Sequence, residues 1–148
     1  MKSPQLEFSI RRRQTGEPSG LELGDLTIVG PGGTATSIGK VPDQGMMIYV
    51  SIAHLMTSVA DLVEARTGSW FELVGVDSSF SVTFEKRRDG TLAIRHEGVM
   101  LAVEAARVVG LRLLSEASRF WKEWPLAPRD SVHDDFRSSH ARLAALKN

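Results

Sequence analysis

The amino-acid sequence predicts an α+β fold, in which an antiparallel sheet of about five strands carries helices on one face. Apolar and polar residues alternate over residues 80–96 on both sides of Asp89 and Gly90, which is typical of a hairpin with one buried face. Apolar residues of residues 47–66 recur instead at helical spacing. Strands are grouped and joined by short turns, which favours antiparallel pairing.

The register of the predicted hairpin follows from the need to keep its apolar face continuous. A two-residue turn would pair Phe84 with Arg95 and place an arginine on that face. A three-residue turn of Arg88, Asp89 and Gly90 pairs Phe84 with Ile94 instead. We therefore expect the longer turn, with Gly90 at the left-handed position that favours glycine.

The other elements complete the order strand, strand, helix, three strands, helix, helix. We expect strands at residues 6–10, 21–29 and 70–76, a turn at 14–20, a mobile loop from Gly30 to Gly45, and helices at 47–66, about 103–124 and 131–147. Residues 99–101 are expected to lead into the second helix. The whole chain, residues 1–148, is interpreted as one domain that is long enough to bury a core.

Composition excludes several classes of protein. The chain has 18 basic and 18 acidic residues, and this neutrality argues against a dedicated nucleic-acid binder. It has no cysteine, which excludes disulfides and thiolate metal sites. The chain shows neither a signal peptide nor a membrane span, so we expect a cytoplasmic protein. Arginine outnumbers lysine, and alanine, glycine and valine are common, which resembles a bacterial protein from a GC-rich genome.

No pattern of residues meets the demands of a catalytic, cofactor-binding or metal site. The glycine-rich segment resembles a phosphate-binding loop, but Gly33 and Gly39 enclose five residues and Pro42 follows Lys40 closely. The four histidines match no metal-binding spacing, and His96 and His140 are expected on apolar faces with one nitrogen satisfied. We therefore expect no cofactor and favour a protein that is not an enzyme.

Two basic clusters and two tryptophans are the candidate partner-binding residues. If the two clusters meet in the fold, they form a patch for an acidic partner. The tryptophans are three residues apart, so they share a helix face and either pack in the core or anchor a partner. The candidates are Arg11, Arg12, Arg13, Lys86, Arg87, Arg88, Trp121 and Trp124.

The leading functional hypothesis is a bacterial protein-binding module without catalytic activity, such as an immunity protein that blocks a cognate toxin. This hypothesis predicts a specific, acidic protein partner, no membrane or nucleic-acid partner, and leaves homo-oligomers open. One alternative is a small-molecule-binding domain or enzyme, whose pocket lies between the sheet and the loop from Gly30 to Gly45 and uses Asp77, Arg95 and His96. A second alternative is a structural subunit of a larger assembly.

Overall fold

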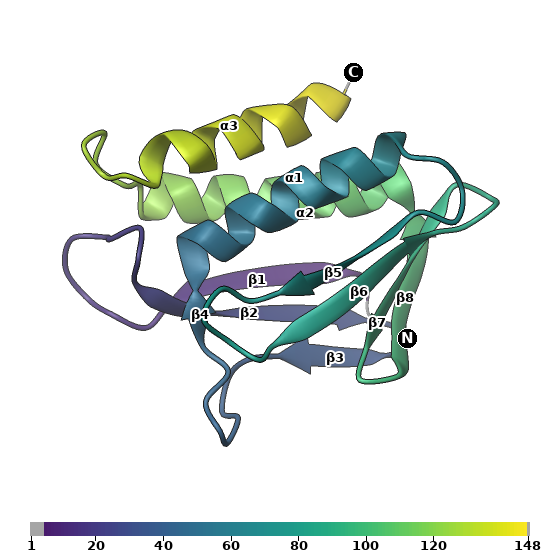
Figure 1. The fold of residues 1–148 in the computed structure, drawn as a ribbon, viewed down its shortest axis with the longest axis horizontal. Coiled ribbons are helices and arrows are strands. Elements are labelled where there is room, and N and C mark those ends of the chain that lie inside the picture. Colours follow the sequence, from purple (N-terminus) through teal and green to yellow (C-terminus); the bar gives the residue numbers. More distant parts are fainter. Residues whose placement is uncertain (1–4, 148) are drawn as a thin grey trace.

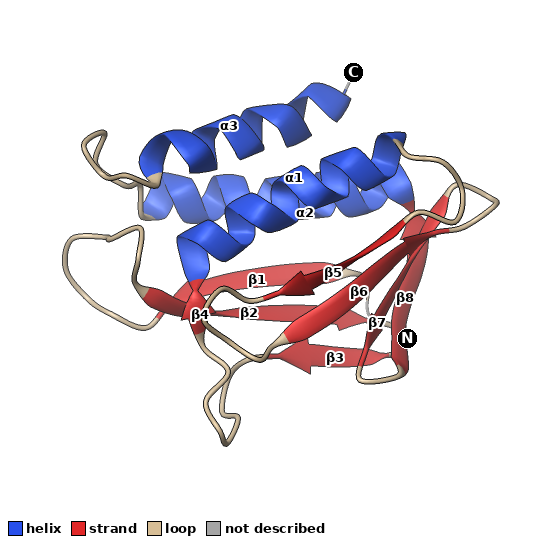
Figure 2. Ribbon diagram, viewed as in Figure 1, coloured by secondary structure: helices blue, strands red, loops and turns tan. Residues whose placement is uncertain are grey.

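The computed structural model describes residues 5–147, which form eight strands, three α-helices and one 3-10 helix. These are β1 (Glu7–Arg12), β2 (Leu23–Gly30), β3 (Gly33–Thr36), β4 (Met46–Met47), α1 (Ile48–Glu64), β5 (Trp70–Val74), β6 (Ser81–Lys86), β7 (Thr91–His96), β8 (Val99–Ala105), α2 (Ala106–Glu123), α3 (His133–Ala144) and η1 (Ala145–Lys147). All strand pairs are antiparallel, and the helices lie on one side of the strands (Figures 1 and 2). The predicted α+β class and one-sided helix layer are confirmed.

The strands form two four-stranded sheets that share one core. In the first sheet, β2 pairs with β1 on one edge and with β3 and β4 on the other. The second sheet is a meander in which β5, β6, β7 and β8 pair in chain order. The sheets meet where the Gly32 amide donates a hydrogen bond to the Leu101 carbonyl of β8, at 2.8 Å. A second link runs from the Met47 amide to the Val76 carbonyl, at 3.0 Å.

The hairpin between β6 and β7 has the predicted register. Phe84 pairs with Ile94, and the Arg87 amide donates to the Thr91 carbonyl at 2.9 Å, which leaves a three-residue turn. Gly90 adopts a φ of 83°, in the left-handed region that favours glycine. The alternation of apolar residues therefore fixed which face of this hairpin is buried.

An aromatic cluster joins the three helices. The ring centroid of Tyr49 in α1 lies 5.0 Å from that of Phe120 in α2 and 5.9 Å from that of Phe136 in α3. All three rings are fully buried. Helix α1 lies against the sheets with one face and against α3 with another, so α3 forms an outer layer (Figure 1).

The predicted number of strands is too low, because three strands depend on pairing partners far along the chain. Residues 33–36 lie inside the segment expected to be a loop, but they form β3 on the edge of β2. The two-residue β4 pairs with β2 as well. Residues 99–105 form β8 along β7 rather than leading into α2, which begins at Ala106.

The glycine-rich turn between β2 and β3 has a packing role. A Cβ atom at Gly32 would collide with the backbone carbonyl of Met100 in β8, and one at Gly30 would collide with that of Leu101. The glycines allow the backbones of the two sheets to approach each other. The resemblance of this segment to a phosphate-binding loop therefore reflects close packing between strands.

Candidate functional site

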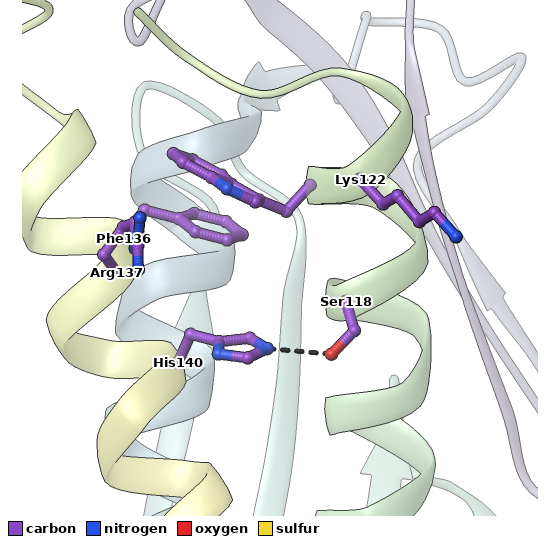
Figure 3. A pocket seen from close by; sticks show the side chains of 6 residues that line it. Ser118, Lys122, Phe136, Arg137 and His140 are labelled. Atoms are coloured by element: carbon purple, nitrogen blue, oxygen red, sulfur yellow. Dashed lines mark hydrogen bonds between the residues drawn. The ribbon is translucent and has the colours of Figure 1, made fainter. Parts of the chain in front are cut away.

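The strongest candidate site is the α2–α3 seam, the line along which α2 and α3 face each other. Helix α3 packs mainly against α1 and less closely against α2, so the seam stays partly open. It contains an upper cleft of about 270 Å³. The side chains that line this cleft are Ser118, Trp121 and Lys122 of α2 and Phe136, Arg137 and His140 of α3 (Figure 3).

Stacked aromatic rings form one end of the upper cleft. The rings of Trp121 and Phe136 are nearly parallel, with an interplanar angle of 16° and centroids 4.7 Å apart. His133, in the first turn of α3, also packs against the indole, with a centroid distance of 5.4 Å. Phe136 is fully buried, whereas Trp121 is half-buried, so the indole is the aromatic surface offered to the cleft.

Ser118 and His140 face each other across the cleft, with Oγ 2.8 Å from Nε2 (Figure 3). Burial, assisted by the positive charge of Arg137, lowers the pKa of His140, so its imidazole is neutral at neutral pH. The contact confirms the prediction that His140 lies on an inward stripe with one nitrogen satisfied.

The Ser118–His140 pair lacks the surroundings of a nucleophilic serine. Such a site needs donors for the oxyanion and a group that stabilises the imidazolium. Here the charge acting on the imidazole is the Arg137 cation, which opposes protonation. Ser118 lies inside α2, where the helix uses the nearby backbone amides. The contact therefore serves to give each of these two half-buried side chains a hydrogen-bond partner.

A lower cleft continues the seam toward the other end of α3. It has a volume of about 50 Å³ and is mainly apolar. Leu114 lies about one turn before Ser118 in α2, and Leu143 lies about one turn after His140 in α3, so the two clefts follow each other along the same pair of helices. The lining residues are Val63, Arg107, Gly110, Leu111, Leu114, Leu143 and Leu146.

Cationic side chains line the seam without any acidic neighbour in either lining. Lys122 and Arg137 line the upper cleft and Arg107 the lower one, and all three are exposed. None of the three makes an ion pair with a residue in the described range 5–147. The Lys122 ammonium points away from His140 in Figure 3, at the end of a long and flexible stem. The linings of the two clefts thus carry three cations and no carboxylate, in a chain of zero formal charge.

The side chain of Arg12, one of the predicted site residues, is buried and bound to internal partners. Only 3% of its side chain is exposed, and its Nε lies 2.6 Å from Oε1 of Glu22. Its guanidinium carbon lies 4.7 Å from the ring centroid of Trp124, whose carbonyl accepts a 2.7 Å hydrogen bond from the Tyr49 hydroxyl. Trp124 therefore packs over the end of β1, whereas Trp121 faces α3. The two tryptophans do not share a face.

Two more of the predicted basic residues have internal partners. Arg13 binds the carboxylates of Asp25 and Asp43, at 2.8 and 2.7 Å, and so ties the loop of residues 37–45 to the sheet. Lys86 donates to the carbonyls of Val63 and Ala65 at the end of α1, at 2.6 and 2.8 Å. Both side chains therefore stabilise chain ends or loops.

The two predicted basic clusters lie at opposite ends of the molecule. β1 ends at the left of Figure 1, and the β6–β7 hairpin lies at the right. Arg11 lies near the end of β1, and Arg87 and Arg88 lie in the hairpin. All three side chains are exposed. The condition for a joint patch, that the ends meet, is not fulfilled.

The residues of the alternative pocket do not converge. His96 is buried, and its Nδ1 lies 2.8 Å from the Ser81 carbonyl, whereas Arg95 faces the opposite side of β7 and contacts Glu85 at 3.3 Å. Asp77 occupies a turn with a φ of 60°. Within residues 5–147, no group of three or more histidine, aspartate or glutamate side chains is placed to hold a metal ion.

The sequence contained part of the signal for the seam. Trp121 was singled out, but Lys122, Arg137 and Arg107 each look like ordinary exposed residues of separate helices. Their shared feature, a place along two clefts whose linings contain no carboxylate, becomes visible only when α2 and α3 are placed side by side. Among the described residues, no helix is both long and apolar enough to cross a bilayer.

Comparisons with protein-family models, with curated proteins and with solved structures found no match to this chain.

Proposed function

We propose that this protein is a protein-binding module whose α2–α3 seam receives an acidic, amphipathic segment of a partner protein. One observation carries the proposal: two consecutive clefts with apolar walls are bordered by the cations Arg107, Lys122 and Arg137 and by no carboxylate. An acidic segment would provide the missing counter-charges. Its apolar residues would cover the indole of Trp121 and the leucines of the lower cleft.

The seam has the form that favours a helical or extended segment over a small molecule. Clefts spaced about one turn apart along two helices suit side chains at positions i and i+3 or i+4 of a docked helix. The cations at the rim would accelerate the encounter with an acidic partner and fix its orientation. The partly exposed indole of Trp121 would act as the anchor, since tryptophan is frequent among the residues that dominate binding energy.

An inhibitor of a cognate toxin is the kind of binding module that we propose, because blocking a toxin needs a complementary surface and no catalytic group. We propose that the protein acts in the cytoplasm of a bacterium, in line with its composition. The alternatives are a small-molecule-binding domain or enzyme, and a structural subunit of a larger assembly.

A capture experiment with matched variants tests the proposal. The tagged protein is incubated with extract of its native cell, and bound proteins are quantified by mass spectrometry for the parent, for Lys122→Glu/Arg137→Glu, and for Arg87→Glu/Arg88→Glu. We expect a stoichiometric partner that the parent and the hairpin variant retain and the seam variant loses. With that partner purified, Trp121→Ala should weaken binding by about 2 kcal/mol or more, roughly thirtyfold in Kd.

Two outcomes would contradict the proposal. A partner lost only by the hairpin variant would place the interface at Arg87 and Arg88 of the β6–β7 hairpin, which borders the start of α2, and not at the cations of the seam. A bound metabolite seen by native mass spectrometry, retained in the parent and lost in Ser118→Ala, would favour the enzyme or small-molecule alternative. Thermal unfolding of each variant controls for loss of the fold.

A further inference from the structure

β1 is an edge strand with backbone groups that face away from its sheet. Within the described residues it pairs with β2 alone. The amide and carbonyl of Ile10 point outward, since both bind side chains of α2 and not β2. Backbone direction alternates along a strand, so the corresponding groups of Phe8 point outward as well. The edge therefore offers donors and acceptors in the pattern that another strand would use.

Two side chains of α2 occupy the central position of this edge and form what we call the Glu116–Arg119 clamp. The Ile10 amide donates to Oε2 of Glu116 at 2.7 Å, and Nη2 of Arg119 donates to the Ile10 carbonyl at 3.0 Å. Glu116 and Arg119 also bind each other, with Nε 2.7 Å from Oε1 and Nη2 2.8 Å from Oε2. The clamp thus presents one acceptor and one donor to Ile10, as a neighbouring strand would.

A groove runs along the same edge, with a volume of about 610 Å³. Its walls are β1 and the residues after it on one side and Glu116, Arg119, Glu123 and Trp124 on the other. The clamp bridges this groove at Ile10, which is only 1% exposed, and the contact between Arg12 and the Trp124 ring bridges it at the end of the strand.

The charges on β1 are complementary to those of a second, antiparallel copy of the same strand. Glu7 and Arg11 are both exposed, and neither makes an ion pair with a residue of the described part of the chain. They are four residues apart, or about 13 Å along a strand, so they cannot bind each other. In an antiparallel pair of two β1 strands centred on Ser9, each Glu7 lies opposite an Arg11, and each Phe8 opposite an Ile10.

This register agrees with the backbone as well as with the charges. The residues that turn their backbone groups outward, Phe8 and Ile10, pair with each other and exchange two hydrogen bonds at each site. Glu7 and Arg11 fall on the close, non-hydrogen-bonded pairs, where opposite charges attract most strongly. We propose that the free edge of β1 is a docking site for a second copy of this chain, which the Glu116–Arg119 clamp holds closed in the monomer. Opening the clamp allows two first sheets to join into one.

Sedimentation velocity over a concentration series tests this inference, independently of any partner of the seam. We expect the parent to be monomeric and the clamp variant Glu116→Ala/Arg119→Ala to dimerise. On the clamp-variant background, Glu7→Arg or Arg11→Glu should each weaken self-association by about tenfold or more, because two attractive pairs become repulsive. A mixture of these two reversed proteins should form a heterodimer, since every Arg then faces a Glu.

The outcomes separate the inference from its alternatives. A folded clamp variant that stays monomeric at every concentration would overturn it, and so would a dimer that is indifferent to the charges at positions 7 and 11. Glu116→Met/Arg119→Met removes the hydrogen-bonding groups but keeps long, helix-forming side chains, and it replaces the alanine variant if that protein loses its helical circular dichroism. Arg87→Glu, at the far end of the molecule, is the control for a general effect of charge.

Discussion

Arg12 and Glu22 form an ion pair that is almost completely removed from solvent. The exposed fractions of the two side chains are 3% and 1%, and Nε lies 2.6 Å from Oε1. Glu22 also accepts the amide of Ser19 at 2.8 Å, and Trp124 covers the guanidinium. The pair closes the long turn between β1 and β2 and connects it to the end of α2.

Removal of one member of this pair should strongly destabilise the fold. Arg12→Met leaves the Glu22 carboxylate buried without its counter-charge, which should lower the free energy of unfolding by about 3–5 kcal/mol. Urea denaturation followed by circular dichroism measures the change. Arg11→Met, on the exposed face of the same strand, is the control and should change stability by less than about 0.5 kcal/mol. Equal effects of the two variants would contradict a special role for the buried pair.

The Arg13 cluster should make stability fall in acid. Burial opposes ionisation of Asp25, but hydrogen bonds from Arg13 and Ser37 outweigh it, so the pKa of Asp25 lies below its ordinary 3.8. Hydrogen bonds from Arg13 and from the Gly45 amide also lower the pKa of Asp43. Carboxylates with a lowered pKa in the folded state contribute stability above the unfolded value. We therefore expect this contribution to be complete above pH 3.8 and to decline as the pH falls below it.

Urea unfolding midpoints measured across this acid range show whether stability falls with the pH as expected. Asp25→Asn should reduce the loss of stability between neutral and acid pH. Asp135→Asn is the matched control, because Asp135 is an exposed carboxylate of α3 without an ion pair among residues 5–147. An acid profile that Asp25→Asn leaves unchanged would show that other groups govern the acid response.

The half-buried imidazole of His140 should add a second pH dependence near neutrality. Burial, with a further contribution from Arg137, lowers the pKa of His140 below its ordinary 6.5. The unfolded chain therefore binds a proton more readily than the folded protein, and stability should decrease as the pH falls through 6.5. His140→Gln should flatten this part of the profile. His54→Gln, on the exposed side of α1, should leave it in place.

The turn at Gly90 gives a test of backbone conformation alone. A Cβ atom at Gly90 would meet no atom within 4 Å, so only the φ of 83° opposes a side chain. Gly90→Val should destabilise the protein by about 1–3 kcal/mol, because β-branched residues resist positive φ. Gly90→Asn, which tolerates the left-handed region, should be closer to the parent. Equal unfolding midpoints for the Gly90→Val and Gly90→Asn proteins would refute this explanation.

The sequence by itself determined the elements whose causes are local. The hairpin register, the left-handed Gly90 and the helical stripe of α1 follow from alternation, turn chemistry and helical spacing, which act between residues close together in the chain. The apolar faces also predicted a one-sided layer of helices. The same register, turn and helix are expected in any fold that buries these apolar faces.

Tertiary structure alone decided which segments meet. β3, β4 and β8 are strands because β2 and β7 offer them edges, and the glycines before β3 are needed because β8 passes close by. Arg12 looked like part of an exposed basic run, but the turn after β1 brings Glu22 to it. The α2–α3 seam likewise arises when two helices place their cations side by side. Such features depend on contacts between distant residues, and local periodicity carries no information about those partners.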